Sequence, residues 1–326
     1  MEAGHTHEAV GSADGHCAVT TELDRPRGGN RRRNLGIVAG TLAIGFLAYA
    51  LISGWSEIAN YAWHPNWGLL VVSMVVIFVS YFVTGGAYVA VVDSLVTPTP
   101  SHRRMLAVWG VSLIGRYVPG SVVMVAGRME MARKYGVPRR ATVAATIYEQ
   151  VLSVGVAAAV GAAFVLAYGD LGPRWLTWLV AFLPLGLIVL HPRVIGPTLG
   201  HALRRIGREP LPQVIPLRRV GVLAIWYLAA QLVLGVGVWL GVRALGGPAV
   251  GSVAFVAGAF LFSFAVSMLV VIVPSGLGIR EGAFALALAQ HVPGSVAVAL
   301  AVVSRLEITV VELLAVGAFG LIARRQ

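Results

Sequence analysis

The chain alternates long runs of apolar residues with short segments that are rich in arginine. A helix needs about 20 apolar residues to cross the hydrocarbon core of a bilayer. Runs of about this length predict six full transmembrane helices, at 35–53, 68–92, 141–168, 174–191, 220–242 and 296–322. Two further apolar segments, 105–127 and 252–291, are interrupted by proline and glycine, so each predicts a broken helix.

The composition supports a membrane protein. Hydrophobic residues make up 57% of the 326 residues and charged residues only 12%, against about 25% charged residues in typical soluble domains. Because most exterior positions of a soluble protein must be wettable, this composition excludes a soluble enzyme, a disordered regulator and a fibrous protein. Residues 1–34 are polar and predict a disordered cytoplasmic tail, and the one cysteine, Cys17, allows no intrachain disulfide.

The positions of the positive charges predict an orientation. Eighteen cationic residues lie in segments that belong to one side of the apolar runs, whereas the opposite loops contain two, Arg174 and Arg243. The positive-inside rule therefore places the tail and the C-terminal residues 323–326 in the cytoplasm of a multi-pass plasma-membrane protein. On this interpretation the net charge of +11 reports topology, and no nucleic acid is expected as a partner.

The two broken segments predict re-entrant hairpins. Segment 105–127 has arginine clusters at both ends, so it enters from the cytoplasm, turns at Pro119-Gly120 and returns. By parity, segment 252–291 enters from outside and turns near residues 274–278. Irregular backbone at membrane depth is tolerated where it is buried in protein or lines a wet cavity, so the two breaks predict a cavity. The alternative is two ordinary kinked spans, which would give eight crossings.

The two broken segments also predict an internal repeat. Each break is followed by a basic and an acidic residue and then by a helix with a central glutamate. The two series are Arg128, Glu130 and Glu149, and Arg280, Glu281 and Glu307. Since the copies have opposite orientations, they suggest the inverted-topology repeat of secondary transporters, with a binding site near the membrane midplane. Chance similarity between apolar segments is the alternative. The expected fold is thus an all-α polytopic membrane domain over residues 35–322, with six spans and two oppositely oriented hairpins.

Seven charged side chains fall inside apolar segments, where each costs roughly 2.5–3.5 kcal/mol at a helix centre. They are Arg116, Glu149, Arg280, Glu281, Arg305, Glu307 and Glu312. Such residues normally face the interior of a bundle and pair with one another. Arg305 and Glu312 share a helix face, so one interpretation is a structural pair that clamps helices together. Glu307 lies about 200° around the helix from Arg305 and points elsewhere.

Polar residues and helix ends near the breaks suggest a site for a phosphate. One polar stripe is expected along the helix that carries Glu149, formed by Thr142, Thr146, Glu149, Gln150 and Ser153. Half-helices that begin at Pro119-Gly120 and at Gly278 would point their amides into the cavity. Arg116 and Arg280 would add charge-assisted hydrogen bonds. The glutamates would neutralise these arginines, accept protons or meet a cationic headgroup, and the sequence does not choose among these roles. The expected headgroup-binding residues are Arg116, Pro119, Gly120, Arg128, Glu149, Gly276, Gly278, Arg280, Glu281, Arg305 and Glu307.

Two runs of the chain carry a family resemblance. The first is Gly115-Arg116-Tyr117-Val118-Pro119-Gly120, followed by Arg128 and Glu149, and the second is Val273-Pro274-Ser275-Gly276-Leu277-Gly278-Ile279-Arg280-Glu281-Gly282. They resemble the two signatures of the lysylphosphatidylglycerol synthase transmembrane (flippase-like) family. The chain departs from the family pattern at Ser275, which separates the usual proline-glycine pair, and at Arg116, where the family often has lysine. The resemblance covers about residues 35–322.

The resemblance implies a domain that translocates lipids. In bifunctional members a soluble aminoacyl-transferase domain follows the membrane domain. This chain stops at Gln326, so we expect a stand-alone member without aminoacyl transfer. Stand-alone members are often associated with glycolipid or polyprenyl-lipid pathways.

The expected function is a flippase or transporter for a polar, anionic, phosphate-containing lipid. The alternatives are an ion-coupled transporter of small solutes and a non-catalytic membrane subunit of a lipid-modifying or glycosyltransferase system. The spans contain no His-Glu-x-x-His, no Gly-x-Gly-Asp and no Ser–His pairing, so no catalytic residue, metal or cofactor is expected. Membrane lipids are the expected partners, and a homodimer and a separate lipid synthase or glycosyltransferase stay open. The lipid, the direction of transport and the energy source also stay open.

Overall fold

The computed structural model describes residues 51–98, 100–117, 122–168, 215–269 and 278–324, and residues 45, 48 and 49. Every regular element in these ranges is an α-helix or a 3-10 helix. The predicted tail 1–34 and the predicted span 174–191 lie outside the described residues, as does most of the predicted span 35–53. The fold is therefore all-α over the described part of the chain.

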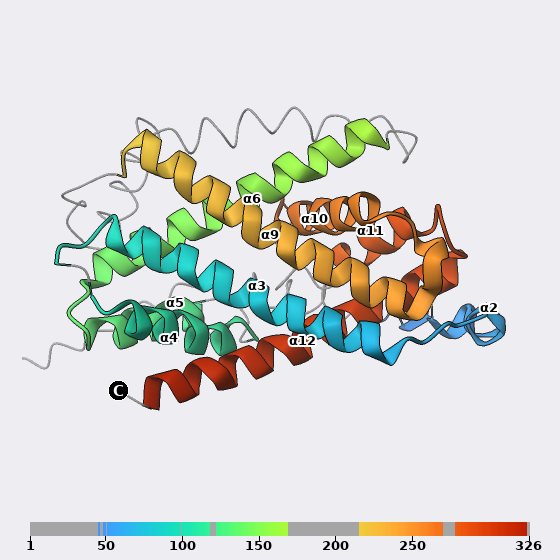
Figure 1. The fold of residues 1–326 in the computed structure, drawn as a ribbon, viewed down its shortest axis with the longest axis horizontal. Coiled ribbons are helices and arrows are strands. Elements are labelled where there is room, and N and C mark those ends of the chain that lie inside the picture. Colours follow the sequence, from blue (N-terminus) through green and yellow to red (C-terminus); the bar gives the residue numbers. More distant parts are fainter. Residues whose placement is uncertain are drawn as a thin grey trace, which may run out of the picture.

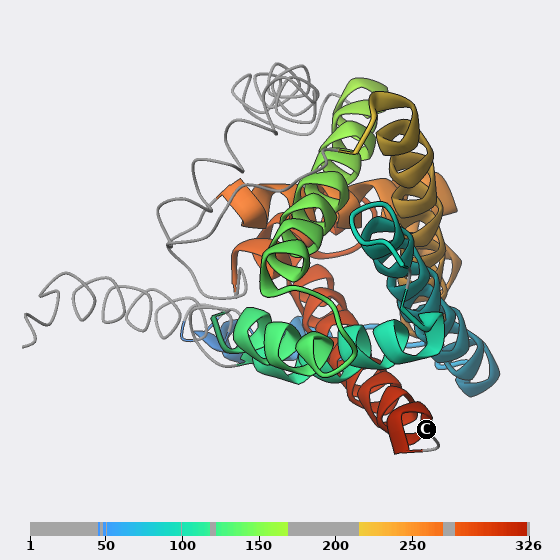
Figure 2. The same ribbon diagram turned by 90° about the vertical axis from the view of Figure 1, so that its left-hand side faces the viewer.

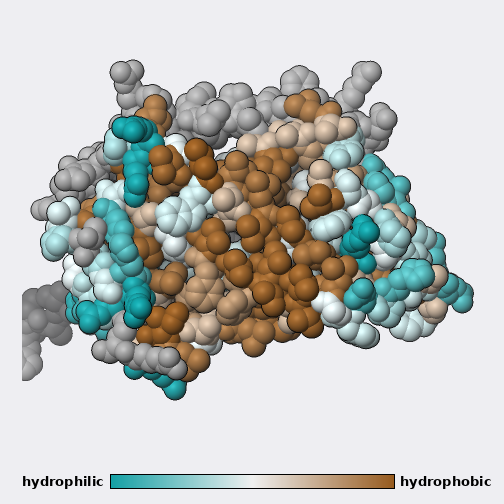
Figure 3. All heavy atoms as spheres, in the orientation of Figure 1, coloured by the Kyte–Doolittle hydropathy of each residue, from teal (hydrophilic) through white to brown (hydrophobic). Residues whose placement is uncertain are grey.

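Four helices are long and apolar enough to cross a membrane. They are α3 (Trp67–Asp93), α6 (Arg139–Ala167), α9 (Leu217–Gly246, continued by the 3-10 helix η2, Gly247–Val250) and α12 (Gly294–Arg324). They confirm four of the six predicted spans. Each extends along the length of the molecule in Figure 1, and Figure 3 shows a hydrophobic band between two hydrophilic ends.

The outer faces of these helices are apolar. Large exposed hydrophobic side chains include Val71, Val75 and Val79 on α3 and Leu306 and Leu313 on α12. A contiguous apolar surface of this kind marks contact with another apolar phase. Lipid tails supply such a phase, so the exposed side chains fit a bundle that is surrounded by a bilayer.

The helices begin and end at residues that suit helix boundaries. The Asn66 side chain accepts a hydrogen bond from the Leu69 amide at 3.0 Å and so caps α3. Pro138 and Pro216, both extended, precede α6 and α9, where a missing amide costs nothing. Gly247 follows α9 with φ 72°, a conformation that glycine adopts readily.

Helix α6 packs closely on α10 (Val253–Leu269). A Cβ atom at Gly161 would lie 2.9 Å from the Cα atom of Phe262, closer than atoms can pack. Glycine at this position therefore permits the close packing of α6 on α10.

The first broken segment forms two packed arms. One arm is α4 (His102–Ser112) followed by the 3-10 helix η1 (Leu113–Tyr117), and the other is α5 (Val122–Arg133). A Cβ atom at Gly115 would lie 2.6 Å from the Cα atom of Met124, so the arms touch near the break. The predicted turn at Pro119-Gly120 lies outside the described residues.

The second broken segment also forms two packed arms, α10 and α11 (Ile279–Leu288). The rings of Phe260 and Phe284 join them, with centroids 5.7 Å apart. In Figure 1 the α4–α5 pair lies in the left half and the α10–α11 pair toward the right, where the short α2 (Trp55–Asn60) also lies. Viewed from the left end, α4 and α5 lie low in the bundle and α6 and α9 rise above them (Figure 2). The two broken segments therefore lie toward opposite ends of the spanning helices.

Candidate functional site

The predicted intramembrane charges divide into three groups, and the first surrounds Arg128 on α5. Arg128 is completely buried and forms an ion pair with Glu149 of α6. Its Nε donates to the Ser112 hydroxyl at 2.9 Å, and its Nη1 lies 3.4 Å from the Thr146 hydroxyl oxygen. The second oxygen of Glu149 accepts from the indole of Trp109 at 2.6 Å. These contacts join α4, α5 and α6.

A ring completes this group. The Arg128 guanidinium lies 4.6 Å from the centroid of the Tyr88 ring on α3, within cation–π range. Both charges of the pair are thus matched, and the pair holds the first broken segment against α3 and α6. We call Arg128, Glu149, Trp109, Ser112 and Tyr88 the clamp.

Two polar residues near the clamp are exposed. Glu130, which follows the first break as Glu281 follows the second, is exposed whereas Glu281 is buried, and it pairs with Arg139 at 2.7 Å and Arg133 at 3.6 Å. The hydrogen bond from Arg139, with the nearby positive charges, holds the pKa of Glu130 below its ordinary value. Gln150 is also exposed, because it lies about 100° around α6 from the buried Glu149.

The second group connects the first broken segment to α12. The Arg116 guanidinium on η1 lies 3.3 Å from the Glu312 carboxylate, whose other oxygen accepts from the Tyr81 hydroxyl at 3.1 Å. The suggested pairing of Arg305 with Glu312 is therefore wrong. Glu312 pairs with Arg116 of the first broken segment, and Arg305 pairs with Glu281 of the second. These neighbouring segments bring opposite charges closer to Glu312 and Arg305 than the two residues are to each other on α12.

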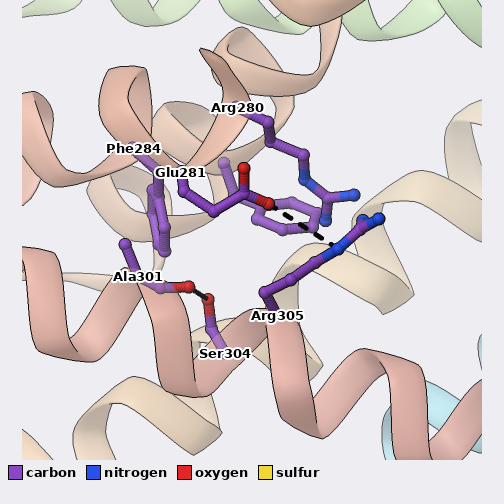
Figure 4. Close-up of a pocket in the computed structure, with 7 residues that line it drawn as sticks. Arg280, Glu281, Phe284, Ala301, Ser304 and Arg305 are labelled. Carbon is purple, nitrogen blue, oxygen red and sulfur yellow. Dashed lines mark hydrogen bonds and ion pairs between the residues drawn. The ribbon is translucent and has the colours of Figure 1, made fainter. Parts of the chain in front are cut away.

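The third group lines a small pocket between α10, α11 and α12, with about 170 Å³ of empty space when the open solvent at its mouth is included. Its walls are Phe260, Arg280, Glu281, Phe284, Ala301, Ser304 and Arg305. In Figure 4 the side chains of Arg280 and Arg305 converge on the same side of Glu281. One Glu281 oxygen lies 3.6 Å from the Nε of Arg305. The Arg280 guanidinium lies 4.4 Å from the centroid of the Phe260 ring.

The pocket lining contains two positively charged side chains, Arg280 and Arg305, and one negatively charged side chain, Glu281. Among the described residues, no carboxylate lies within ion-pair distance of Arg280, and Glu281 is shared between Arg305 and the backbone. A guanidinium presents planar donors that match phosphate or carboxylate oxygens. The pocket is therefore suited to an anionic group placed between Arg280 and Arg305.

The start of α11 differs from the expectation. The Gly278 amide, with φ 84° at that residue, donates to the second Glu281 oxygen at 2.7 Å. This amide is therefore engaged within the protein and does not point freely at a ligand. The remaining predicted site residues Pro119, Gly120 and Gly276 lie outside the described residues.

Glu307 lies apart from the three groups, as its angle around α12 predicted. It is buried and contacts Ser73 of α3 at 2.5 Å.

Several residues of these groups were not found from the sequence. Trp109 and Ser112 lie three residues apart on one helix face, so their polar atoms were a usable signal. Tyr88 and Phe260 carried no such signal, because an aromatic ring under a guanidinium looks in sequence like a ring that faces lipid. Ser73 was likewise one small polar residue in an apolar run.

The fold and the buried charges together define a multi-pass membrane protein. A model of the family described as lysylphosphatidylglycerol synthase TM region matches residues 35–317, nearly the whole chain, and the protein belongs to this family. The comparisons with curated proteins and with solved structures gave no match.

Proposed function

We propose that the protein moves the headgroup of an anionic, phosphate-containing lipid across the plasma membrane. The observation that carries this proposal is the pocket, in which Arg280 and Arg305 converge around a single carboxylate. A headgroup phosphate in this place would satisfy the unmatched guanidinium, while the acyl chains stay against the apolar outer faces of the bundle. Family membership supports a role with lipid headgroups.

The proposed route for the phosphate follows one face of α12. Glu312 lies seven residues, or about 10 Å, beyond Arg305 on that helix. It holds Arg116 at 3.3 Å, as Glu281 holds Arg305 at 3.6 Å. A phosphate that displaces Glu281 from Arg305 would next meet Arg116 by displacing Glu312. The two carboxylates keep the arginines neutralised when no headgroup is present.

The proposed topology has six spans, two hairpins that enter the membrane from opposite sides, and both termini in the cytoplasm. The placement of the α4–α5 and α10–α11 pairs toward opposite ends of the bundle supports this arrangement. The first pair also carries the cationic residues Arg103, Arg104 and Arg133, which the positive-inside rule assigns to the cytoplasm.

The proposal assigns no covalent chemistry to the protein. Within the described ranges, no three His, Cys, Asp or Glu side chains gather closely enough to hold a metal ion. We propose membrane lipids as the partners, with a separate lipid synthase or glycosyltransferase supplying or consuming the transported lipid. Copurification with such an enzyme, without lipid movement by the protein alone, would instead favour the role of a membrane subunit.

The test is a headgroup-accessibility assay. The full chain is reconstituted in liposomes that contain a fluorescent anionic phospholipid or its zwitterionic counterpart, and an impermeant quencher reports exposure of the headgroup. We expect faster exposure of the anionic lipid. A hydrogen bond to a charged group contributes about 1.5–3 kcal/mol, so Arg280→Gln should slow exposure about tenfold or more.

The exposed Arg133→Gln is the matched control and should keep the wild-type rate. No acceleration for any anionic lipid would overturn the proposal, and a wild-type rate in Arg280→Gln would overturn the site. Uptake of a water-soluble substrate without lipid movement would favour the solute transporter.

A further inference from the structure

Glu307 is a buried acid at the contact of three spanning helices. It lies on α12 with 8% of its surface exposed, and its Oε1 is 2.5 Å from the hydroxyl oxygen of Ser73 on α3. The same hydroxyl oxygen is 2.7 Å from the carbonyl oxygen of Gly237 on α9. Three oxygen atoms from three helices therefore lie in a row at hydrogen-bond distances.

The number of protons in this row identifies the state of Glu307. A serine hydroxyl has one proton and can donate it to one acceptor. If Ser73 donates to Glu307, its contact with the Gly237 carbonyl contains no proton, and two oxygen lone pairs face each other. If Glu307 is protonated, it donates to Ser73, and Ser73 donates to Gly237. Only the protonated acid gives each close contact a hydrogen.

Within the described part of the chain, Glu307 has no cation at ion-pair distance that would stabilise its ionised form. Helix α12 packs against α2, α3, α4, η1, α9 and α11. Among the described residues, no cationic group on these elements lies within ion-pair distance of Glu307.

The charged and titratable groups of these elements have other partners or lie at helix ends. On α12, Arg305 pairs with Glu281 of α11 and Glu312 contacts Arg116 and Tyr81. On α3, Tyr88 lies under Arg128 and Asp93 pairs with His102. On α9, Arg243 lies over Trp239. Arg218 and Arg219 lie in the first turn of this helix, and Tyr227 lies further along it. The others are Arg280 at the pocket, Glu57 of α2 against Ser295, Arg103 and Arg104 at the start of α4, and Arg324 in the last turn of α12.

The packing is shaped around this acid. A Cβ atom at Gly241 would lie 3.0 Å from the Ser73 hydroxyl oxygen and would also collide with the Glu307 carboxylate. Glycine at this position on α9 therefore leaves the space that the acid occupies. An ionised carboxylate in this space would be desolvated and uncompensated, which is strongly unfavourable.

The acid is next to the pocket along α12. Ser304, which lines the pocket, precedes Glu307 by three residues and so lies one turn away on the same side of the helix. Glu307 is about 20 Å from the first residue of α12, near the middle of this helix. A movement of this helical turn would therefore displace both the pocket lining at Ser304 and the carboxyl group of Glu307.

We propose that Glu307 is a proton-carrying residue that couples the conformation of the pocket to the proton gradient. In the conformation described here the acid is neutral and holds α3, α9 and α12 together. When these helices separate and water reaches the carboxyl group, Glu307 releases its proton to that water, and it takes up a proton again before the helices close. The coupling part of this proposal rests on the proposed transport, whereas the protonation part does not.

Infrared difference spectroscopy of the purified full chain tests the protonation. We expect the carbonyl stretching band of a protonated carboxylic acid, which disappears as pH rises. Glu307→Gln should remove the band, and Ser73→Ala should shift its frequency by removing the hydrogen-bond acceptor. The exposed Glu57→Gln is the matched control and should leave the band unchanged. Because glutamine keeps the volume and a hydrogen-bond donor of the protonated acid, Glu307→Gln should remain folded, which size-exclusion chromatography checks.

A band that persists in Glu307→Gln, or that is absent from the wild-type protein throughout its stable pH range, overturns the proposal. The liposome assay with an imposed pH gradient tests the coupling. We expect the gradient to change the wild-type rate severalfold and to leave the Glu307→Gln rate unchanged. If lipid moves but neither the band nor the gradient effect is seen, the role of Glu307 is refuted and the proposed lipid transport is not. The band without lipid movement would refute the proposed lipid transport alone.

Discussion

Arg128 and Glu149 form a buried ion pair in which each charge has further partners. Ser112 accepts from the Arg128 guanidinium, and Trp109 donates to the Glu149 carboxylate. The pair joins α5 to α6 and lies in the half of the molecule that holds the first broken segment. Its charges are matched within the protein, so it serves as a structural anchor, in contrast to the pocket.

The clamp should therefore be more important for stability than for specificity. Removing one partner of a buried pair leaves an uncompensated charge and costs about 3–5 kcal/mol. We expect Glu149→Gln and Arg128→Met each to lower the unfolding temperature strongly in detergent. The double variant Arg128→Met/Glu149→Gln, which combines the two single changes, should regain part of the loss. Additive losses in the double variant would contradict a direct pair.

Glu281→Gln should separate binding from movement. The change removes the negative charge that neutralises Arg305 and keeps an acceptor for the Gly278 amide. We expect anionic lipid to be retained more strongly on the purified protein, measured by native mass spectrometry, because the pocket gains positive charge. Headgroup exposure should become slower, because the carboxylate that displaces the headgroup is missing. Weaker retention of anionic lipid would argue against this role.

Gly241→Ala should disturb the contact between Ser73 and Glu307. The added methyl group has no space there, and overpacking typically costs about 1–3 kcal/mol. Gly221→Ala on the same helix has nothing within 4 Å of the new atom and serves as the control. Helix propensity alone should make that control neutral or more stable by up to about 1 kcal/mol. Thermal unfolding of both variants compares them, and equal stabilities would contradict the close packing.

The ion pairs of Glu130 should make a small contribution to the stability of the fold, and this contribution should depend on pH and salt. Because its pKa is lowered in the folded protein, its ionised form stabilises the fold above the ordinary glutamate pKa, and this contribution is lost as the pH falls. Solvent and salt screen an exposed pair of this kind. We expect Glu130→Gln to be slightly less stable than wild type near neutral pH in low salt. The difference should vanish at acidic pH or in high salt, and a difference that persists in high salt would point to another cause.

Cysteine labelling tests the proposed orientation. In a Cys17→Ser background, a single cysteine replaces Arg133 at the end of α5 or Glu57 on α2. An impermeant thiol reagent added to intact cells should label the Glu57→Cys variant only. Labelling of the Arg133→Cys variant from outside would reverse the orientation.

The sequence predicted the four described spans well, because a bilayer demands long apolar runs. It also selected the buried charges, whose cost makes them rare. It did not predict the partners correctly. Glu312 contacts Arg116 and Arg305 contacts Glu281, since these pairs depend on how η1, α11 and α12 approach one another in space. The exposure of Glu130 and Gln150 depends on which face of each helix packs against its neighbours, and the sequence alone did not identify that face.

Glu281 connects the pocket to the local stability of α11. One of its oxygens accepts from the amide of Gly278, the residue before α11, and the other faces Arg305. An anion that draws Arg305 away leaves Glu281 free to reorient, and the first turn of α11 then loses part of its cap. Ligand occupancy would thus be visible as faster hydrogen exchange at the Gly278 amide, a group that the ligand itself does not need to touch. The helix start would act as a built-in reporter of the pocket.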